Sequence, residues 1–278
     1  MCIRDRACTS VPDERMTSYV DFPETRELTS RTLTLDSALF RYPYRVRVQD
    51  DKAVVFDLHG TEYFFHAFHY PGFHYLSSFG KRGDAPEEML SAENLRWNGN
   101  FLWTLDSNKS ELTRLGFASS GDSLLRLEAV SLDEELLRAL DFVQYDDSTF
   151  IIPDYSGDSR FCLVSRQGKL LRKIGTISTA NEDALKSARP ALAQAWRSFI
   201  DYNPRNGMLA AVTQLGEVLE IYNLKDSTHI VRVGPNGEPE FQISQGYGIP
   251  TGIMGFSDIQ VTDSACLLYT SPSPRDTR

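Results

Sequence analysis

Apolar and polar residues alternate along five short segments of the chain, and these segments share one pattern. Each begins with a strand-like run and a polar turn, and the first four continue into a second strand-like run that usually ends in Asp. Alternation with period two is typical of β-strands, because successive side chains point to opposite faces of a strand. Paired strands joined by a short polar turn indicate β-hairpins. The segments are 44–57, 93–106, 141–154, 198–213 and 257–264.

The spacing of the segments indicates a repeat. The closing residues Asp57, Asp106 and Asp154 are 49 and 48 residues apart, and Thr213 closes the fourth segment after 59 residues. Two further strand-like runs follow each of the first four segments. Four antiparallel strands repeated about every 50 residues are typical of a propeller blade. The sequence therefore predicts an all-β fold, a β-propeller of four-stranded antiparallel blades, with four blades over about 44–242 and the start of a fifth.

The first strand of every segment carries one polar position between two apolar positions. The first apolar row is Val46, Leu95, Val143, Ile200 and Ile259. The second apolar row is Val48, Trp97, Tyr145, Tyr202 and Val261. The polar row between them is Arg47, Arg96, Gln144, Asp201 and Gln260. Because the first strand of a blade lies nearest the propeller axis, the polar row is predicted to recur around the central channel.

Helical signal is concentrated in one stretch, 181–196, which accounts for the longer third interval. It contains several Ala and Leu residues, and Pro190 is placed where a proline favours the first turn of a helix. We interpret the stretch as a helical insertion between two blades. It has two possible roles, a lid over one face of the propeller or a loop without function.

The two ends of the chain are related at the level of codons. Residues 1–6 can be read back as ATGTGTATAAGAGACAG, and the residues from Cys266 onward can be read back as the reverse complement. Folding does not explain such a relation, and both stretches resemble transposase adapters used to build sequencing libraries. We therefore assign 1–6 and 266–278 to adapter-derived sequence, 7–27 to an N-terminal tether and 28–265 to a C-terminally truncated propeller.

The composition argues against nucleic-acid binding, a membrane span and a disulfide framework. The 278 residues carry a formal net charge of −9, which argues against binding to a phosphate backbone, since that needs a basic face. No run approaches the roughly 18 consecutive apolar residues of a membrane span. Within 7–265 the cysteines are Cys8 and Cys162. One cysteine inside the fold cannot form a disulfide framework, and Cys162 is predicted to be a small buried apolar residue.

The segment 78–88 reads SFGKRGDAPEE. It resembles the F-G-x-x-G-x-G-P-x-E loop of TolB-like six-bladed propeller proteins, with Ala85 in place of the usual Gly before Pro86. The run 203–222 is similar to the same family, and the resemblance covers about 28–264. It implies a ring of six blades and a location in the envelope of Gram-negative bacteria, where these proteins are mostly secreted or lipid-anchored. The family is largely uncharacterised, so the resemblance supplies no catalytic residues.

Cys8 follows the small residue Ala7 at the start of the tether. A small residue before Cys is how the signal peptide of a bacterial lipoprotein ends. Taken alone, the pattern favours an unmodified cysteine in a terminal segment, but the family resemblance favours lipidation. We expect Cys8 to be lipidated and the protein to lie in the periplasm or at the cell surface, touching the membrane only through this anchor.

Four of the five histidines lie close together among aromatic residues, at His59, His66, His69 and His74. A metal site needs three or four ligands that converge, whereas His66 and His69 point to opposite faces of an extended strand. No metal and no other cofactor is therefore predicted. The aromatic residues are interpreted as packing between blades, with an exposed aromatic binding face as the alternative.

The polar row provides the candidate ligand-binding residues, and no catalytic residue is assigned. A mixture of Arg, Gln and Asp suits hydrogen bonds to a polar or acidic group, but it equally suits solvation of a water-filled channel. The leading interpretation is a non-enzymatic propeller that binds an envelope protein or a glycan and is monomeric when complete. The alternatives are a hydrolase or lyase acting on a sugar or lactone, and a structural scaffold.

Overall fold

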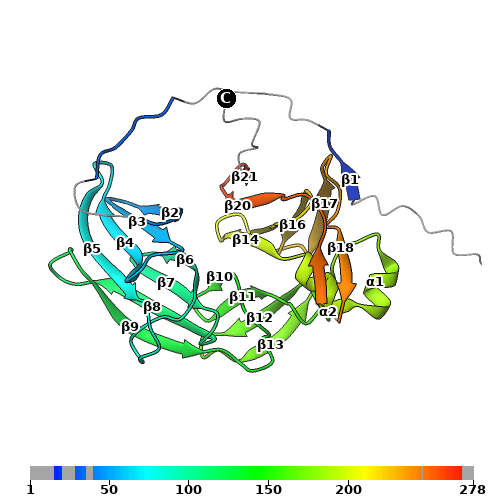
Figure 1. The fold of residues 1–278 in the computed structure, drawn as a ribbon, viewed down its shortest axis with the longest axis horizontal. Coiled ribbons are helices and arrows are strands. Elements are labelled where there is room, and N and C mark those ends of the chain that lie inside the picture. The colour runs from blue at the N-terminus through cyan, green and yellow to red at the C-terminus, as the bar shows by residue number, and fades with distance from the viewer. Residues whose placement is uncertain (1–15, 21–28, 36–39, 246, 271–278) are drawn as a thin grey trace, which may run out of the picture.

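Four four-stranded antiparallel sheets stand side by side along an arc, each with its first strand on the inner side (Figure 1). The computed structural model describes residues 16–20, 29–35, 40–245 and 247–270. The arrangement confirms the predicted all-β propeller with four complete blades. The arc stays open between the first blade and a C-terminal hairpin (Figure 1).

The blades follow the predicted repeat closely. Blade 1 contains β2 (Pro43–Gln49), β3 (Lys52–Asp57), β4 (Tyr63–His69) and β5 (His74–Lys81). Blade 2 contains β6 (Ala92–Asn98), β7 (Phe101–Asp106), β8 (Glu111–Phe117) and β9 (Leu124–Ser131). Blade 3 contains β10 (Val143–Asp146), β11 (Thr149–Pro153), β12 (Phe161–Ser165) and β13 (Leu170–Ile174).

Blade 4 is extended by a fifth strand at its outer edge. It contains β14 (Ser198–Asn203), β15 (Met208–Thr213), β16 (Val218–Asn223) and β17 (Thr228–Val233). The short strand β1 (Met16–Ser18) pairs with β17 in parallel. Two hairpins follow along the chain. They are β18 (Phe241–Ser244) with β19 (Tyr247–Pro250), and β20 (Phe256–Val261) with β21 (Cys266–Thr270).

Apolar side chains fill the spaces between neighbouring blades. Between blades 2 and 3 the buried Trp103 meets Phe150 edge-to-face, with ring centroids 5.0 Å apart. Cys162 is fully buried in the same cluster, as predicted, and burial raises the pKa of its thiol to about 12. The thiol therefore stays protonated at neutral pH and serves as an apolar residue.

Some of the aromatic residues of blade 1 pack between blades, as the sequence predicts, and others do not. Phe65 and Phe79 stack with centroids 5.2 Å apart in the cluster between blades 1 and 2. Phe68 belongs to a separate small cluster on the other face of the same blade. The described part of the chain shows no group of three His, Cys, Asp or Glu side chains able to hold a metal ion.

The closing aspartates of blades 1 and 2 fix the start of their own blades. Asp57 accepts hydrogen bonds from the backbone N–H groups of Arg41 and Tyr42, at 2.8 and 2.6 Å. Asp106 accepts four such bonds, at 2.6 to 3.2 Å, from Leu90, Ser91, Asn108 and Lys109. Both carboxylates are almost fully buried. The repeated Asp thus satisfies backbone donors of the connecting loops, which explains why it recurs at the end of the second strand.

Blade 3 departs from the predicted common register by one residue. Val143 pairs with Ile151, whereas the equivalent residue of blade 2, Leu95, pairs with Thr104, which lies one position later in its repeat. A bulge between Gln144 and Asp146 accompanies the shift. Val143 therefore packs with residues of blade 4, while Leu95 packs toward blade 1. Extra residues in bulges turn the following side chains to the other face of a strand.

The apolar rows are buried only where a neighbouring blade covers them. Leu95 and Ile200 have no exposed surface, whereas Val46 and Val48 of blade 1 are 46% and 45% exposed. Val46 and Val48 pair with Val55 and Ala53, so all four side chains are on the same face of blade 1. That face borders the opening of the arc, because the opposite face carries the residues that pack on blade 2. The two valines are exposed because no blade lies beside that face.

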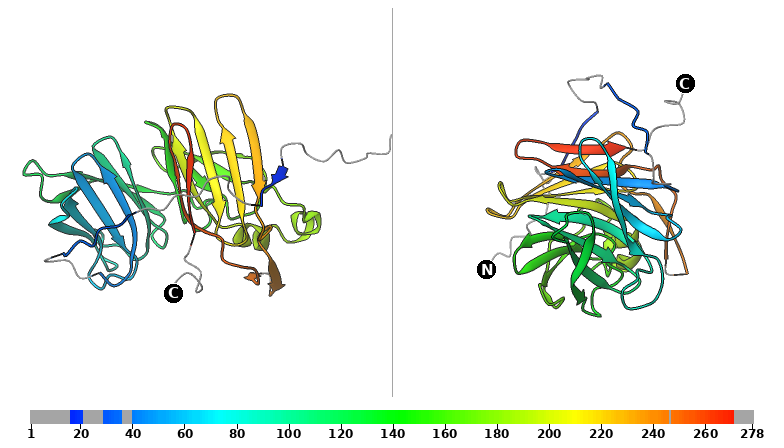
Figure 2. Two further views of the ribbon diagram at one scale, coloured as in Figure 1. Left: turned by 90° about the horizontal axis from the view of Figure 1, so that it is seen from above. Right: turned by 90° about the vertical axis from the view of Figure 1, so that its left-hand side faces the viewer.

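The predicted helical insertion is present as α1 (Glu182–Ser187) and α2 (Arg189–Ala195), with Pro190 in the first turn of α2. Both helices lie at the end of the molecule beside blade 4 (Figures 1 and 2). Leu192 and Trp196 are fully buried against Val218 and Val231 of that blade. The insertion is therefore part of the core at this end of the arc, and not a lid over the axis.

Two segments assigned outside the propeller pair with it. β1 lies within the stretch 7–27, and β21 lies within 266–278. Leu268 of β21 is partly buried against the cluster between blade 4 and β20, which explains why this segment forms a strand. Pairing says nothing of where a segment comes from, so the assignment of 266–278 to adapter sequence stays a prediction.

Replacing Asp106 by Ala is expected to lower the free energy of unfolding by about 3 kcal/mol, because four buried or partly buried N–H groups lose their acceptor. Urea unfolding followed by circular dichroism measures the change. Asp147→Ala is the matched control, since Asp147 is exposed in a turn, and it should change stability by less than about 0.5 kcal/mol. Equal effects of the two substitutions would contradict the role given to Asp106.

Candidate functional site

The inner strands of the five repeats meet at a cluster of buried charges near the axis. Arg96 on β6 is at its centre. Its guanidinium lies 2.6 Å from Asp201 on β14 and 3.2 Å from Asp141, which precedes β10. It also donates a hydrogen bond to the carbonyl oxygen of Ile200. One side chain of blade 2 thus contacts blades 3 and 4.

A second set of ion pairs connects blade 1 to the last hairpin. Arg47 Nη2 lies 3.0 Å from the Asp258 carboxylate on β20, and Arg45 Nε lies 3.1 Å from the same group. Arg45 is almost fully buried and its guanidinium lies over the ring of Phe199, 4.6 Å from the centroid. These contacts hold the two ends of the arc together at the axis, although the arc is open farther out.

Backbone N–H groups and a side-chain amide donate further hydrogen bonds to the carboxylates. Asp141 accepts hydrogen bonds from Asn94 Nδ2 at 2.5 Å and from the N–H of Ile200 at 3.0 Å. Asp201 accepts one from the N–H of Val261 at 2.7 Å. Buried carboxylates are stable only with such partners, and here the partners come from different blades.

Burial and neighbouring charges shift the pKa values of this cluster in different directions. Burial alone would raise the pKa of Asp141, but the positive charges of Arg96 and Arg45 outweigh it and hold the pKa below its usual range. Burial raises the pKa of Asp201 despite the nearby Arg96. Burial would lower the pKa of Arg96, yet Asp141 and Asp201 raise it. Arg96 is therefore charged at every relevant pH.

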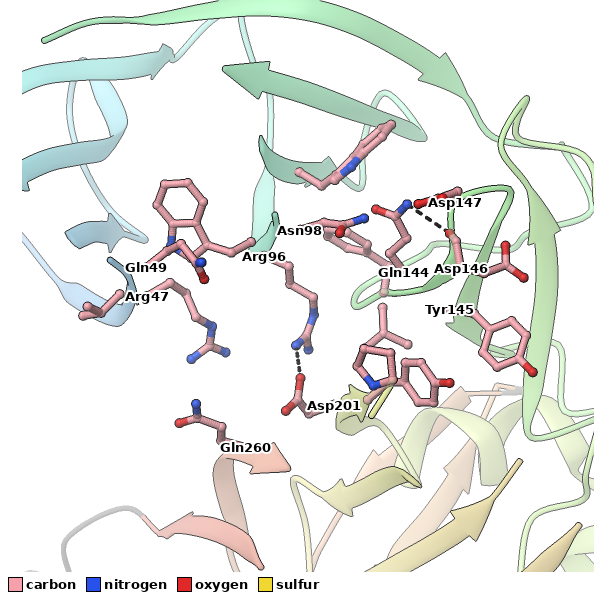
Figure 3. A pocket seen from close by; sticks show the side chains of 17 residues that line it. Arg47, Gln49, Arg96, Asn98, Gln144, Tyr145, Asp146, Asp147, Asp201 and Gln260 are labelled. Carbon is pink, nitrogen blue, oxygen red and sulfur yellow. Dashed lines mark hydrogen bonds and ion pairs between the residues drawn. The ribbon is translucent and has the colours of Figure 1, made fainter. Parts of the chain in front are cut away.

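A cavity of about 480 Å³ opens above this cluster, and all five residues of the predicted polar row line it. They come from five strands of the inner ring, β2, β6, β10, β14 and β20. Figure 3 shows the side chains of Arg47 and Gln260 pointing toward each other, and that of Arg96 pointing toward Asp201. The convergence of the row is a feature of the structure; its role in binding stays a prediction.

The wall of the cavity offers amides and aromatic rings in addition to charges. Gln144 Nε2 donates to the carbonyl of Asp146 at 3.0 Å, which leaves its oxygen without a partner in the described chain. The amides of Asn98 and Gln260 make no hydrogen bond to any described residue, and both line the cavity. The rings of Tyr145 and Tyr202 lie 5.3 Å apart at its side.

Three charged residues of the cluster were not identified from the sequence. Asp141 opens the third repeat, and Asp258 and Arg45 directly precede the first apolar row of their strands. The available signal was a charge beside a buried strand position. That signal does not show which distant strand supplies the partner, and Arg47 and Asp258 are 211 residues apart.

The comparison with protein families agrees with this geometry. A family profile described as "TolB-like 6-blade propeller-like" matches residues 21–277. The chain belongs to the TolB-like 6-blade propeller-like family. No curated protein matches this TolB-like chain.

Two solved structures show the same fold. A putative exported protein from Bacteroides fragilis is 9% identical, with a TM-score of 0.50 over 78% of this chain and 80% of that chain. A member of the DUF4221 family from Bacteroides vulgatus is 10% identical, with a TM-score of 0.51 over 90% of this chain and 79% of that chain. At such low identity the similarity concerns the fold alone.

Two predictions concern the membrane. Among the residues that the structure describes, no helix is both long and apolar enough to span a membrane. Cys8, the predicted lipidation site, lies outside the described residues.

Replacing Arg96 by Met is expected to lower the free energy of unfolding at pH 7 by about 3–5 kcal/mol, because Asp141 and Asp201 stay buried without their counter-ion. Arg205→Met is the matched control. Arg205 pairs with Asp263 at 2.9 Å on the surface, and the loss of that pair should cost less than about 1 kcal/mol.

The deficit of the Arg96→Met variant should shrink as the pH falls toward 4. Protonation neutralises the unpaired carboxylates, beginning with Asp201, whose pKa burial raises. In the wild-type protein the lowered pKa of Asp141 has the opposite consequence: stability present above the unfolded pKa of Asp is lost as the pH falls through the folded value. Urea titrations at pH 7 and pH 4 measure the change in the deficit, and a titration of the wild-type protein at pH 3 measures the loss that follows protonation of Asp141. A pH-independent deficit would contradict the charge explanation.

Proposed function

We propose that this TolB-like protein is a non-enzymatic binding propeller of the bacterial cell envelope, and that its axial cavity binds a neutral, hydroxyl-rich ligand such as a glycan segment. The observation that carries the proposal is the convergence of the five polar-row side chains, from five strands, on one cavity. A solvated channel needs polar residues, whereas this cavity combines free amides and aromatic rings in one lining.

The charges at the cavity favour a neutral ligand over an acidic one. Asp201 and Asp258 already pair with Arg96 and Arg47. The exposed carboxylates of Asp146 and Asp147 also line the cavity or its rim, so its wall carries more negative than positive charge. These carboxylates would repel an anion. Both arginines of the wall already contact a carboxylate, so neither is free to attract an anion.

The uncharged groups match the chemistry of a sugar. A pyranose ring presents hydroxyl groups at its edge and C–H groups on its faces. The amides of Asn98 and Gln260 can each donate to and accept from hydroxyl groups, while Tyr145 and Tyr202 supply apolar ring surface. A few placed polar groups on a partly aromatic wall are the usual composition of a small-molecule site.

The same geometry supports binding more than hydrolysis. General acid–base catalysis on a sugar requires two carboxylates that face the substrate and are available for proton transfer. Asp201 is occupied by Arg96 and by the N–H of Val261. Asp146 accepts hydrogen bonds from the backbone and hydroxyl of Ser148, which help to lower its pKa despite partial burial.

Family membership supports the location in the cell envelope, where the family resemblance places most TolB-like propellers. The relative from Bacteroides fragilis is described as a putative exported protein. Cys8 follows a small residue, and its thiol could carry the lipid anchor. The three observations together favour an exported, anchored protein.

Calorimetric titration with maltotriose, N,N′-diacetylchitobiose and the anionic 3′-sialyllactose tests the ligand class. We expect binding of at least one neutral sugar and a loss of about tenfold in affinity in Gln260→Ala, because one hydrogen bond to the ligand is lost. Gln260 has no partner in the described fold, so this variant should fold normally. Gln167→Ala, an exposed turn amide outside the cavity, is the matched control.

Binding of the anionic sugar alone, or affinities that Gln260→Ala leaves unchanged, would overturn the assignment of a neutral ligand to this cavity. Cleavage of any of the sugars, detected by mass spectrometry of the titrated mixture, would favour the hydrolase or lyase alternative. Absence of binding to all three sugars would count against the proposal.

Lipidation has a separate test. Mass spectrometry of the native protein from its own cells is expected to find an N-terminal Cys8 that carries acyl chains. An unmodified Cys8 within a longer polypeptide would contradict the anchor and leave the cavity proposal untouched.

A further inference from the structure

A second cavity lies between blades 3 and 4, away from the charged cluster. It has a volume of about 350 Å³. Tyr145 lines both this cleft and the axial cavity. The apolar part of the cleft is formed by Ile151, Phe161, Leu163, Leu209, Tyr222 and Leu224.

The cleft exists because the side chains at this interface are small. Between blades 2 and 3, the second strands present Trp103 and Phe150 to each other. Between blades 3 and 4, the corresponding positions are Ile151 and Leu209. Two aliphatic side chains occupy less volume than two aromatic ones. Ile151 and Leu209 are themselves fully buried, so the cleft lies beside this pair, toward the partly buried Leu163, Tyr222 and Leu224.

One wall of the cleft is flat and held in place. The rings of Tyr222 and His229 are stacked, with centroids 4.0 Å apart and an interplanar angle of 8°. Tyr222 donates a hydrogen bond from its hydroxyl to Glu220 at 2.9 Å. Glu220 is in turn paired with the buried Arg160 at 2.7 Å, so the charges behind this wall are matched. Phe161 meets Tyr222 edge-to-face at 5.2 Å.

Arg172 lines the same cleft from β13. It lies opposite Leu163 in the strand pairing and is exposed, and it makes no ion pair or hydrogen bond to any residue that the structure describes. A cation without a carboxylate partner beside an apolar, partly aromatic slot is complementary to an amphiphilic anion. A flat apolar body would lie in the slot beside Tyr222 and Leu163, with its anionic group toward Arg172.

We infer that the cleft between blades 3 and 4 is a second binding site, which takes a planar apolar molecule bearing a carboxylate. The site is independent of the proposed glycan site, since it differs in charge, in lining and in the class of ligand. Only the shared Tyr145 connects the two.

Ligand-observed NMR and calorimetry with 2-naphthoate and its neutral analogue 2-naphthalenemethanol test the inference on the full chain. We expect 2-naphthoate to bind more tightly than the alcohol. Arg172→Gln should weaken naphthoate about tenfold and leave the alcohol nearly unchanged, because only the carboxylate contact is lost. Arg138→Gln is the matched control, since Arg138 is also exposed and lies outside the cleft.

A second variant locates the site without changing charge. Leu163→Trp places a larger side chain in the half-buried wall of the cleft and should abolish binding of both probes, provided that its circular dichroism spectrum matches the wild type. If that variant does not fold, Arg172→Gln decides, because an exposed side chain without partners can be replaced without loss of the fold.

Three results would overturn the inference. They are the absence of naphthoate binding at millimolar concentration, equal affinity for the acid and the alcohol, and equal effects of Arg172→Gln and Arg138→Gln. Gln260→Ala should leave naphthoate binding unchanged. A loss there would instead place the probe in the axial cavity and would also overturn the second site.

Discussion

The contact of Arg96 with Asp141 and Asp201 is the interaction on which the inner part of the molecule depends. Apolar packing joins each blade only to its neighbours, whereas this guanidinium contacts two blades beyond its own. Arg47 and Arg45 do the same between blade 1 and β20 through Asp258. In a medium of low polarity, each of these charges is stable only while the others are in place, so the positions of the inner strands are coupled. That coupling also gives the axial cavity its shape.

Much of the fold could be predicted from the sequence, because blade structure is local. Period-two alternation and the recurring Asp57, Asp106 and Asp154 identify hairpins and their spacing without knowledge of any distant contact. The register of blade 3 could not be predicted, since the bulge at Gln144 depends on which face of β10 meets blade 4. The exposure of Val46 was missed for a related reason, because alternation shows that a face is apolar and not that another sheet covers it.

The candidate site was predicted in part. The polar row lies at corresponding sequence positions of the five repeats, and propeller geometry brings its members to one cavity despite the shifted register of blade 3. The partners of these residues could not be predicted, because Asp141 and Asp258 reach them only through the tertiary fold. The cleft between blades 3 and 4 was also missed. It results from a difference in volume between two interfaces, and the alternation pattern is the same whether the apolar residue is Ile or Trp.

The short strand β1 has a consequence for how the protein behaves beside its own copies. The outermost strand of a sheet presents unpaired backbone groups that can capture the edge of another chain. Charged side chains such as Arg126 and Glu128 on β9, and Arg172 and Lys173 on β13, discourage such capture on blades 2 and 3. β17 reads THIVRV and carries a single full charge, Arg232, apart from its histidine. It is this edge that β1 covers by parallel pairing, so an N-terminal segment of three residues shields an outer edge that has few gatekeeper charges of its own against intermolecular sheet growth.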